Sequence, residues 1–568
     1  MTEIERKYDV DRQQRVPDLL QIEGIAALDF PGTVTLTAVY FDTDALDLAQ
    51  HRIILRRREG GADSGWHLKL PASEGRTEMQ WPLEADPDGA GPADPADLVD
   101  CDDNSGHDSA DVPARVLDPI RTIVRDRPLS SLARITTIRT TVLLLNDQGD
   151  AIAEFADDDV SASDTRGGVF RKWREWEVEL FSAAPATRRE RTALLDRIEA
   201  GLRGAGAQPS TSIAKIARAL GADALTELAP PAARRTKPVE PHAGSAASVV
   251  QALRGLQATL TDLDPRVRAE GYQAVHAMRI TVRRLRSVLS IYRRLFDRAV
   301  VDRLRNDLEV VGLALGAARD ADVRVRRVQK DLEGLSAELR DEAADHRLRS
   351  ESRARAVAAQ DQVRRVLTGR QYFGLLDQLD NFLGDPAVTA KTYQSAAFEV
   401  SKALGRGVTR LQEQTDVALA TVKAAAGAAE GESDEADEAD APRGADEAAG
   451  VVGAGEPIGP VETALHEVRK AARRLRHAAE AATSGADGGK KYRRLAAAAK
   501  EVEKSLGAHR DGLRHREYLT GMAARAHAAG EATFVYGVLA TRAAGAEDGA
   551  IADLRRAVKQ IGALARKL

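Results

Sequence analysis

The first residues of the chain alternate between acidic and basic side chains in a pattern that suits a metal ion beside a phosphate. They read Glu3-Ile4-Glu5-Arg6-Lys7. Successive side chains of a β-strand point to opposite faces, so Glu3, Glu5 and Lys7 share one face. Hard divalent cations prefer carboxylate oxygens, and phosphates prefer ammonium or guanidinium groups. A single strand of this kind is usually a half-solvated sheet face, so the chemical interpretation needs further strands of the same type.

Further strand-like runs carry matching charges. Acidic alternation returns at Glu175, Glu177 and Glu179. Between the two acidic runs lie basic side chains in strand-like segments, at Arg56, Arg58, Lys69 and Arg139. Two acidic runs separated by basic ones are harder to explain as solvated sheet faces, and they favour a charged site inside a β-rich domain.

At this point the sequence resembles the CYTH family, the triphosphate tunnel metalloenzymes. The motifs that carry the resemblance are Glu3-x-Glu5-x-Lys7, Tyr40-Phe41-Asp42-Thr43, Leu55-Arg56-Arg57-Arg58, Trp66-His67-Leu68-Lys69, Arg76-x-Glu78, Glu175-x-Glu177-x-Glu179 and Lys215-Ile216-Ala217-Arg218-Ala219-Leu220. They follow the family's order over residues 1–222. The resemblance implies an antiparallel β-barrel tunnel lined with inward-pointing charges.

The resemblance also implies roles for individual residues. A Mg²⁺ or Mn²⁺ cofactor would be held by Glu3, Glu5, Asp158, Glu177 and Glu179. A triphosphate would be held by Lys7, Arg56, Arg58, Lys69, Arg139 and Lys215. The catalytic set would be Glu3, Glu5, Lys7 and Lys69. The sequence departs from the family pattern at two positions. Gln80 stands where many members have a glutamate, and Ala214 stands where a serine is common. These two differences bear on which substrate is preferred more than on whether the site is active.

Composition limits the classes of protein to consider. With 568 residues, 43% hydrophobic and 30% charged, the chain suits two or three soluble globular domains. Its single cysteine, Cys101, excludes an internal disulfide and a cysteine-based zinc site. No run of about 18 apolar residues is present, so we expect no membrane span and a cytoplasmic protein.

Changes in composition divide the chain. A Pro-rich linker at 223–244 separates the β-rich domain 1–222 from a helical domain at 245–568. We expect the Asp/Pro/Gly-rich run 86–111 to form an external loop. The acidic, Ala/Gly-rich segment 424–460 has almost no large apolar residue, and we expect it to be a disordered linker between helical repeats at 245–423 and 461–568.

The helical domain contains an internal repeat of basic residues. One copy carries His276, Arg279, Arg283 and Arg286, and the other carries His466, Arg469, Arg473 and Arg476. Within each copy the four fall on one narrow helix face. A second pair of motifs, ending in Arg319-Asp320 and Arg510-Asp511, recurs at nearly the same offset. The repeat predicts a duplicated all-α bundle with pseudo-two-fold symmetry. We interpret the Arg-Asp pairs as ion pairs that position the basic helices.

This half resembles the CHAD domain, a helical module known for binding inorganic polyphosphate. A linear row of arginine and histidine matches a linear polyanion. One such helix alone would be an ordinary solvated face, and the duplication favours a ligand surface. Aromatic residues are 4% of the chain and are not interleaved with these arginines, which disfavours nucleic acid.

Two classes of function follow from these features. The first is a metal-dependent triphosphate hydrolase with an appended polyphosphate-binding module. The second is a non-catalytic polyphosphate-binding or granule-associated protein. Within the enzyme class, hydrolysis of thiamine triphosphate and cyclisation of ATP are lesser alternatives because the CYTH family includes both.

Overall fold

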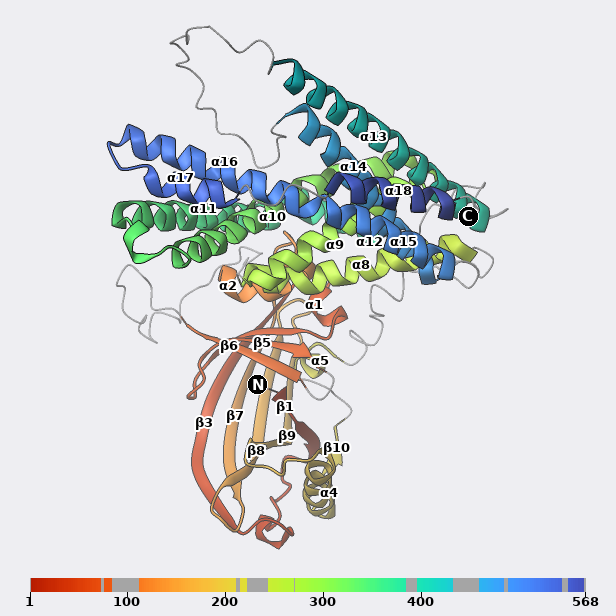
Figure 1. Cartoon of the computed structure of the whole chain (residues 1–568). Coiled ribbons are helices and arrows are strands. Elements are labelled where there is room, and N and C mark those ends of the chain that lie inside the picture. The colour runs from red at the N-terminus through yellow and green to blue at the C-terminus, as the bar shows by residue number, and fades with distance from the viewer. Residues whose placement is uncertain are drawn as a thin grey trace. The chain divides into compact units, whose positions relative to one another are not determined.

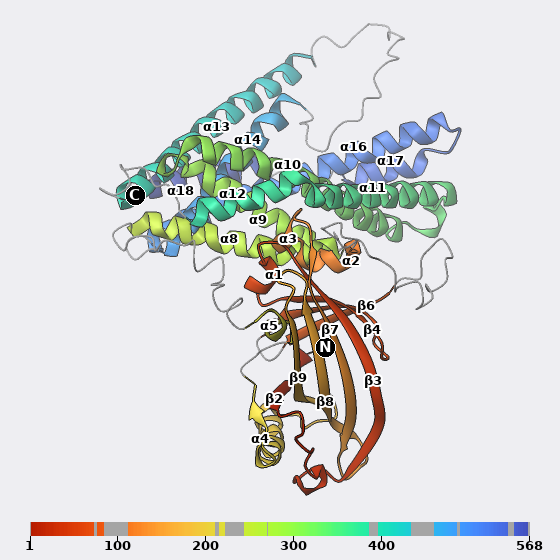
Figure 2. The same cartoon turned by 180° about the vertical axis from the view of Figure 1, so that it is seen from behind.

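The computed structural model of the chain (Figures 1 and 2) describes residues 2–72, 76–83, 112–210, 215–221, 244–269, 271–384, 396–432, 459–484, 489–543 and 550–565. The chain divides into two compact units, Met1–Arg234 and Arg235–Leu568. The predicted loop 86–111, Ala214 and most of the predicted linkers 223–244 and 424–460 lie outside the described residues.

The first unit is built around an antiparallel sheet of ten strands in the order β1-β6-β5-β4-β3-β7-β8-β9-β2-β10. The strands are β1 (Thr2–Glu3), β2 (Glu5–Val10), β3 (Ala27–Asp42), β4 (Ile54–Glu59), β5 (Gly65–Pro71), β6 (Arg76–Pro82), β7 (Ser130–Leu145), β8 (Ala151–Asp164), β9 (Phe170–Leu180) and β10 (Gln208–Pro209). The helices are α1 (Asp47–Gln50), α2 (Ala114–Leu117), α3 (Arg121–Val124), α4 (Arg188–Gly204) and α5 (Lys215–Leu220). The long strands β3, β7 and β8 lie side by side and curve together (Figure 1).

The two ends of this sheet are brought together by the N-terminal segment. β1 pairs with β6, and β2 pairs with β9, although only Ile4 separates β1 from β2. The strand order is nevertheless linear, so the described strands form a curved, unclosed sheet. The predicted antiparallel β fold is confirmed, and its strands form this open sheet in place of a closed barrel.

Side-chain alternation gives this sheet a charged face and an apolar face. Trp176 and Val178 of β9 are fully buried on the apolar face, in one core with Ile198 and Leu202 of α4. A capping box formed by Thr187 and Glu190 starts α4. The opposite face, which carries the glutamates of β9, is called the inner face below.

The second unit is helical throughout its described elements, as the sequence predicts. The helices are α8 (Gly244–Arg268), α9 (Tyr272–Ile291), α10 (Arg298–Glu333), α11 (Glu342–Thr368), α12 (Arg370–Gly384), α13 (Ala396–Glu432), α14 (Pro460–Ala481), α15 (Gly489–Ser505), α16 (Gly507–Ala528), α17 (Phe534–Ala543) and α18 (Ala550–Ala565). The apolar stripe Val275, Met278, Val282 and Leu285 of α9 is buried in the main core.

The packing of the helices repeats along the chain. In the first half α8 packs on α9, α9 on α10 and α10 on α12; in the second half α13 packs on α14, α14 on α15 and α15 on α18. The hairpins α10–α11 and α16–α17 share a separate small core and lie side by side (Figure 2). Helices α9 and α14 also pack together, and there Ser287 Oγ and His477 Nδ1 are 3.1 Å apart. These two residues are equivalent in the repeat, and such a contact is what a pseudo-two-fold axis produces.

One predicted boundary is wrong. Helix α13 continues to Glu432, whereas the composition of the sequence predicts a disordered linker from Ala424 onward. Residues 424–429 are alanine except for one glycine, and alanine has the highest helix propensity. No described helix is both long and apolar enough to cross a membrane.

Candidate active site and anion-binding surface

A row of three glutamates crosses neighbouring strands on the inner face. Glu5 of β2 is paired with Glu179 of β9, and Glu179 is paired with Glu154 of β8. Burial raises the pKa of Glu179, and Glu5 raises it further. Burial also raises the pKa of Glu154. The row therefore concentrates like charges, and a divalent cation bound there would compensate them.

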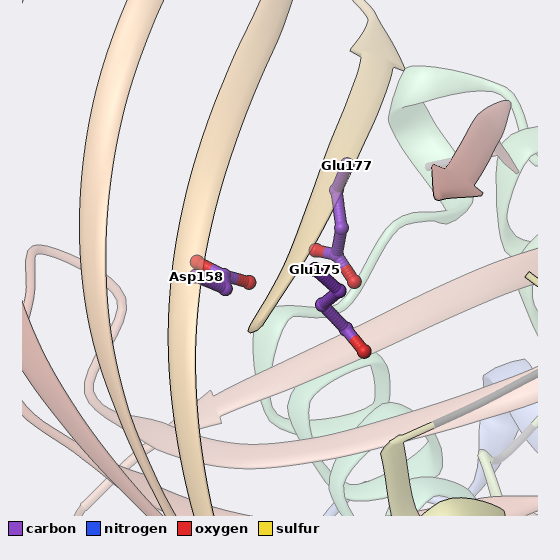
Figure 3. A group of neighbouring side chains, drawn as sticks. All are labelled: Asp158, Glu175 and Glu177. Carbon is purple, nitrogen blue, oxygen red and sulfur yellow. The ribbon is translucent and has the colours of Figure 1, made fainter. Parts of the chain in front are cut away.

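A second acidic group lies next to this row. Asp158 of β8 and Glu175 and Glu177 of β9 are buried, and their carboxylates offer ligand atoms within 4.8 Å of one another (Figure 3). This cluster could hold a divalent metal ion. Register explains the proximity, because Asp158 is paired directly with Glu175 across the two strands.

The protein's own cations already compensate this cluster. Lys215 Nζ lies 2.9 Å from Asp158, 2.7 Å from Glu175 and 2.5 Å from Glu177. Arg139 binds Asp158 through two nitrogens, at 2.8 and 2.7 Å, and Glu177 at 2.5 Å. Lys7 pairs with Glu177 as well.

The pKa values within the cluster reflect these contacts. Burial alone would lower the pKa of Lys215, but Asp158, Glu177 and Glu175 raise it well above its ordinary value. Burial would raise the pKa of Glu177, but Lys215, Lys7 and Arg139 hold it well below its usual range. The ammonium group of Lys215 thus lies where a metal ion among these three carboxylates would lie.

The remaining predicted cations surround Glu78 on the neighbouring strands. Arg56 Nη2 and Lys69 Nζ lie 3.7 and 3.8 Å from Glu78 Oε1, and His67 Nδ1 lies 2.8 Å from the same atom. Burial, together with the nearby charges of Arg56 and Arg139, lowers the pKa of Arg58 to about 10. Arg58 also pairs with Asp63. These cations also act on the two acidic groups. Arg139, which binds the cluster, lowers the pKa of Arg58, and Lys69 lowers the pKa of Glu179 in the row of glutamates.

The structure thus brings most of the predicted tunnel residues onto one face. Those in the connected network are Glu5, Lys7, Arg56, Arg58, Lys69, Arg139, Asp158, Glu177, Glu179 and Lys215. The side chain of Glu3 lies outside the described part of the chain. Glu154 was not among the site residues predicted from the sequence, although it shares a strand face with Asp158 four residues later. Glu175 belongs to a predicted motif but was given no role, and it lies in the cluster with Asp158 and Glu177.

In the helical unit, the basic residues of the two repeat copies meet where α9 packs on α14. Burial, together with the charges of Arg473 and Arg279, lowers the pKa of Arg283 to about 9. Burial also lowers the pKa of Arg473, and the charges of Arg469 and Arg279 act in the same direction. Burial, Arg319, Arg279 and Arg283 together lower the pKa of His276. The four arginines 279, 283, 469 and 473 therefore form one electropositive group, called the arginine cluster below.

Acidic residues position part of this surface. Asp320 lies 3.3 Å from Arg279 and 3.5 Å from Arg514, so it holds α9 and α16 to α10. Arg286 pairs with Glu309 at 2.7 Å. Asp320 thus has the positioning role that the sequence predicts, and Arg319 stacks on the ring of Tyr272, 4.5 Å from its centre. The side chains of Arg510 and Asp511 lie outside the described part.

Comparisons with known proteins divide the chain in the same way. The CYTH domain model matches residues 1–203, and the CHAD domain model matches residues 251–520. The uncharacterized protein Rv2226 of Mycobacterium tuberculosis is 34% identical over 580 residues, which cover 100% of this chain and 97% of that protein.

Two solved structures are similar over more than half of this chain. PptA from Streptomyces chartreusis matches at 16% identity and a TM-score of 0.40, over 57% of this chain and 99% of its own. The CHAD domain from the plant Ricinus communis matches at 21% identity and a TM-score of 0.35, over 56% and 90%. From the domain matches and the full-length relative, this chain belongs to the family of proteins in which a CYTH domain is followed by a CHAD domain.

Proposed function

We propose that the first unit hydrolyses inorganic triphosphate or a related triphosphate with the help of a divalent metal ion. The observation that carries the proposal is the inner face, where six basic side chains surround two acidic groups. Membership of the CYTH family makes a triphosphate-type substrate the natural ligand for these cations. Burial strengthens their interaction with phosphate oxygens because less water screens it.

The acidic row fits a hard divalent cation better than the cluster around Lys215. Burial and the neighbouring charges of Glu5 and Glu154 raise the pKa of Glu179, whereas Lys215, Lys7 and Arg139 hold the pKa of Glu177 well below its usual range. We assign Glu5 and Glu179, with Glu3 and Glu154, as the residues that would hold Mg²⁺ or Mn²⁺. Bound there, the metal supplies neutralisation of charge on the phosphate oxygens.

The basic residues would hold the triphosphate in line for attack by water on its terminal phosphoryl group. These residues are Lys7, Arg56, Arg58, Lys69, Arg139 and Lys215. Substrate gives Lys7, Arg139 and Lys215 a second set of anionic partners. Asp158 and Glu177 would then become available as additional metal ligands.

For the helical unit, we propose binding of inorganic polyphosphate along the arginine cluster and its extensions at His276, Arg286, His466 and Arg476. Four guanidinium groups of like charge lie together, their neighbours lower the pKa values of Arg283 and Arg473, and an oxyanion chain would relieve that repulsion. Such binding would also associate the protein with polyphosphate granules.

A second candidate for the first unit is binding without turnover. The cations of the inner face already neutralise a carboxylate cluster, and the same cations could hold a triphosphate tightly without a metal. Orthophosphate release from tripolyphosphate, measured with Mg²⁺, with Mn²⁺ and with EDTA, separates the two. Release only with metal supports hydrolysis, and stoichiometric binding without release under all three conditions supports the second candidate. Thiamine triphosphate and ATP serve as comparison substrates.

A further inference from the structure

Glu503 of α15 places a carboxylate at the point where the two basic helices meet. Its Oε1 lies 2.7 Å from Arg473 Nε, and its Oε2 lies 3.1 Å from Arg476 Nη1. The same carboxylate is 3.9 Å from Arg283 Nη2. Arg283 belongs to the first copy of the repeat, and the other two arginines belong to the second. One side chain therefore contacts arginines of both copies.

The contacts of Glu503 are those that a phosphate group would make. A carboxylate and a phosphate both present oxygens to the guanidinium fork. Burial would raise the pKa of Glu503, but Arg473, Arg476 and Arg283 lower it, so the group carries its charge. One carboxylate serves three guanidinium groups here, and the arginine cluster keeps an excess of positive charge.

The first copy of the repeat has no carboxylate at the equivalent place. Aligning Leu315-Gly316 with Leu506-Gly507 puts Gly312 opposite Glu503. The structure supports this alignment, because a Cβ at Gly312 would lie 4.0 Å from Arg286 Nη1, and Arg286 is the equivalent of Arg476. The duplication thus contains its own comparison at this position, with a carboxylate in one half and a glycine in the other, where Arg286 pairs instead with Glu309, three residues earlier on the same helix.

We propose that Glu503 is a built-in competitor for the polyphosphate site, and that a bound chain must displace its carboxylate from Arg473, Arg476 and Arg283. The inference rests on the proposed polyphosphate binding by the helical unit. A single small anion gains little binding free energy here, because its contacts with the three arginines only replace those that Glu503 loses. A long chain contacts further arginines at the same time, so Glu503 selects long polyphosphate over orthophosphate.

The test uses the full chain and labelled long-chain polyphosphate. Glu503→Gln keeps the shape and removes the charge, and we expect it to bind the chain about tenfold more tightly. The inhibition constant of unlabelled orthophosphate should fall by more than this factor, because orthophosphate has no further arginines to offset the displacement of Glu503. The first unit is identical in both proteins, so the difference reports on Glu503. Glu501→Gln on the exposed side of the same helix changes the net charge equally and should leave both values unchanged.

A reciprocal variant avoids the loss of an existing contact. Gly312→Glu adds a carboxylate beside Arg286, and the nearest atoms to its Cβ, Val282 Cγ1 at 3.5 Å and Arg286 Nη1 at 4.0 Å, are at ordinary contact distances. It should weaken binding of the long chain about tenfold, while Gly312→Gln should not.

The outcomes separate this inference from the function it rests on. If the parent binds polyphosphate but Glu503→Gln binds no more tightly and Gly312→Glu matches Gly312→Gln, Glu503 is only an ion-pair partner and the proposal is overturned. If the parent does not bind long-chain polyphosphate at all, the function proposed for the helical unit is wrong.

Discussion

Replacing Lys215 with methionine would show what a cation among Asp158, Glu175 and Glu177 contributes. Methionine keeps the length of the side chain and removes the ammonium group that lies 2.5–2.9 Å from all three carboxylates. Arg139 would still contact Asp158 and Glu177, and Lys7 would still contact Glu177. Glu175 would lose its closest basic partner and keep a hydrogen bond from Trp173 Nε1.

The expected cost follows from this partial loss. Breaking a buried ion pair by removing one partner costs about 3–5 kcal/mol, and the contacts that remain place this variant near 3 kcal/mol. For a unit of this size that corresponds to a fall in Tm of roughly 6–12 °C. All four tryptophans, Trp66, Trp81, Trp173 and Trp176, lie in the first unit, so fluorescence of the full chain follows its unfolding alone.

The difference between parent and variant should depend on pH. In the parent, the basic neighbours hold the pKa of Glu177 well below its ordinary value of 4.5. Its contribution to stability is therefore present above about pH 4.5 and is lost as pH falls through the folded-state pKa. In the variant part of this effect is missing, so the loss of stability should be largest near pH 7 and should shrink below about pH 4.5.

A divalent ion should replace the missing ammonium group. We expect Mn²⁺ to raise the Tm of the variant more than that of the parent in the absence of phosphate. A variant that is as stable as the parent at pH 7, with no additional stabilisation by Mn²⁺, would refute the idea that Lys215 occupies a cation site.

Three further predictions address the two units. The Glu5→Gln variant should require more Mg²⁺ than the parent for orthophosphate release from tripolyphosphate, and the control variant Glu59→Gln, at an exposed position, should not. Full turnover of Glu5→Gln at limiting Mg²⁺ would contradict the assignment of Glu5 as a metal ligand. A chain ending near Asp223 should keep that activity, and loss of activity with a folded β-type circular dichroism spectrum would show that the helical unit completes the site. Glutamine in place of all four arginines of the arginine cluster should greatly weaken polyphosphate binding, most visibly at low salt, with an unchanged helical signal; equal binding would make them a solvated face.

The sequence predicted the faces of the strands but not the register between them. Strand alternation alone puts Glu5 and Lys7 on one face, and the structure places Arg6 on the other, where it contacts Asp196 of α4 at 2.7 Å. Register decides that Asp158 lies opposite Glu175 and that Glu154 lies opposite Glu179. No pattern within a single strand contains that information, which explains why Glu154 and Glu175 were not assigned.

In the helical unit, too, the sequence revealed the motifs but not the contacts between helices. The repeat revealed the basic helices and their equivalence, because each copy carries the motif within one helix. Glu503 lies outside that motif and reaches Arg473 only through the packing of α15 on α14. Asp320 could be recognised from the sequence as a positioning residue, but its partners come from α9 and α16 and depend on the tertiary structure.

The pairing of β2 with β9 has a consequence for how the first unit folds. Strand β2 must pair with β9, and its Lys7 contacts Glu177, which is 170 positions further along the chain. Pairing over so long a separation forms slowly, because loop closure precedes any compensating contact. During synthesis β2 therefore waits until β9 has left the ribosome. The acidic row, which needs Glu5 beside Glu179, is completed only in that late step, so a chain that stalls before it lacks one of the three glutamates of the row.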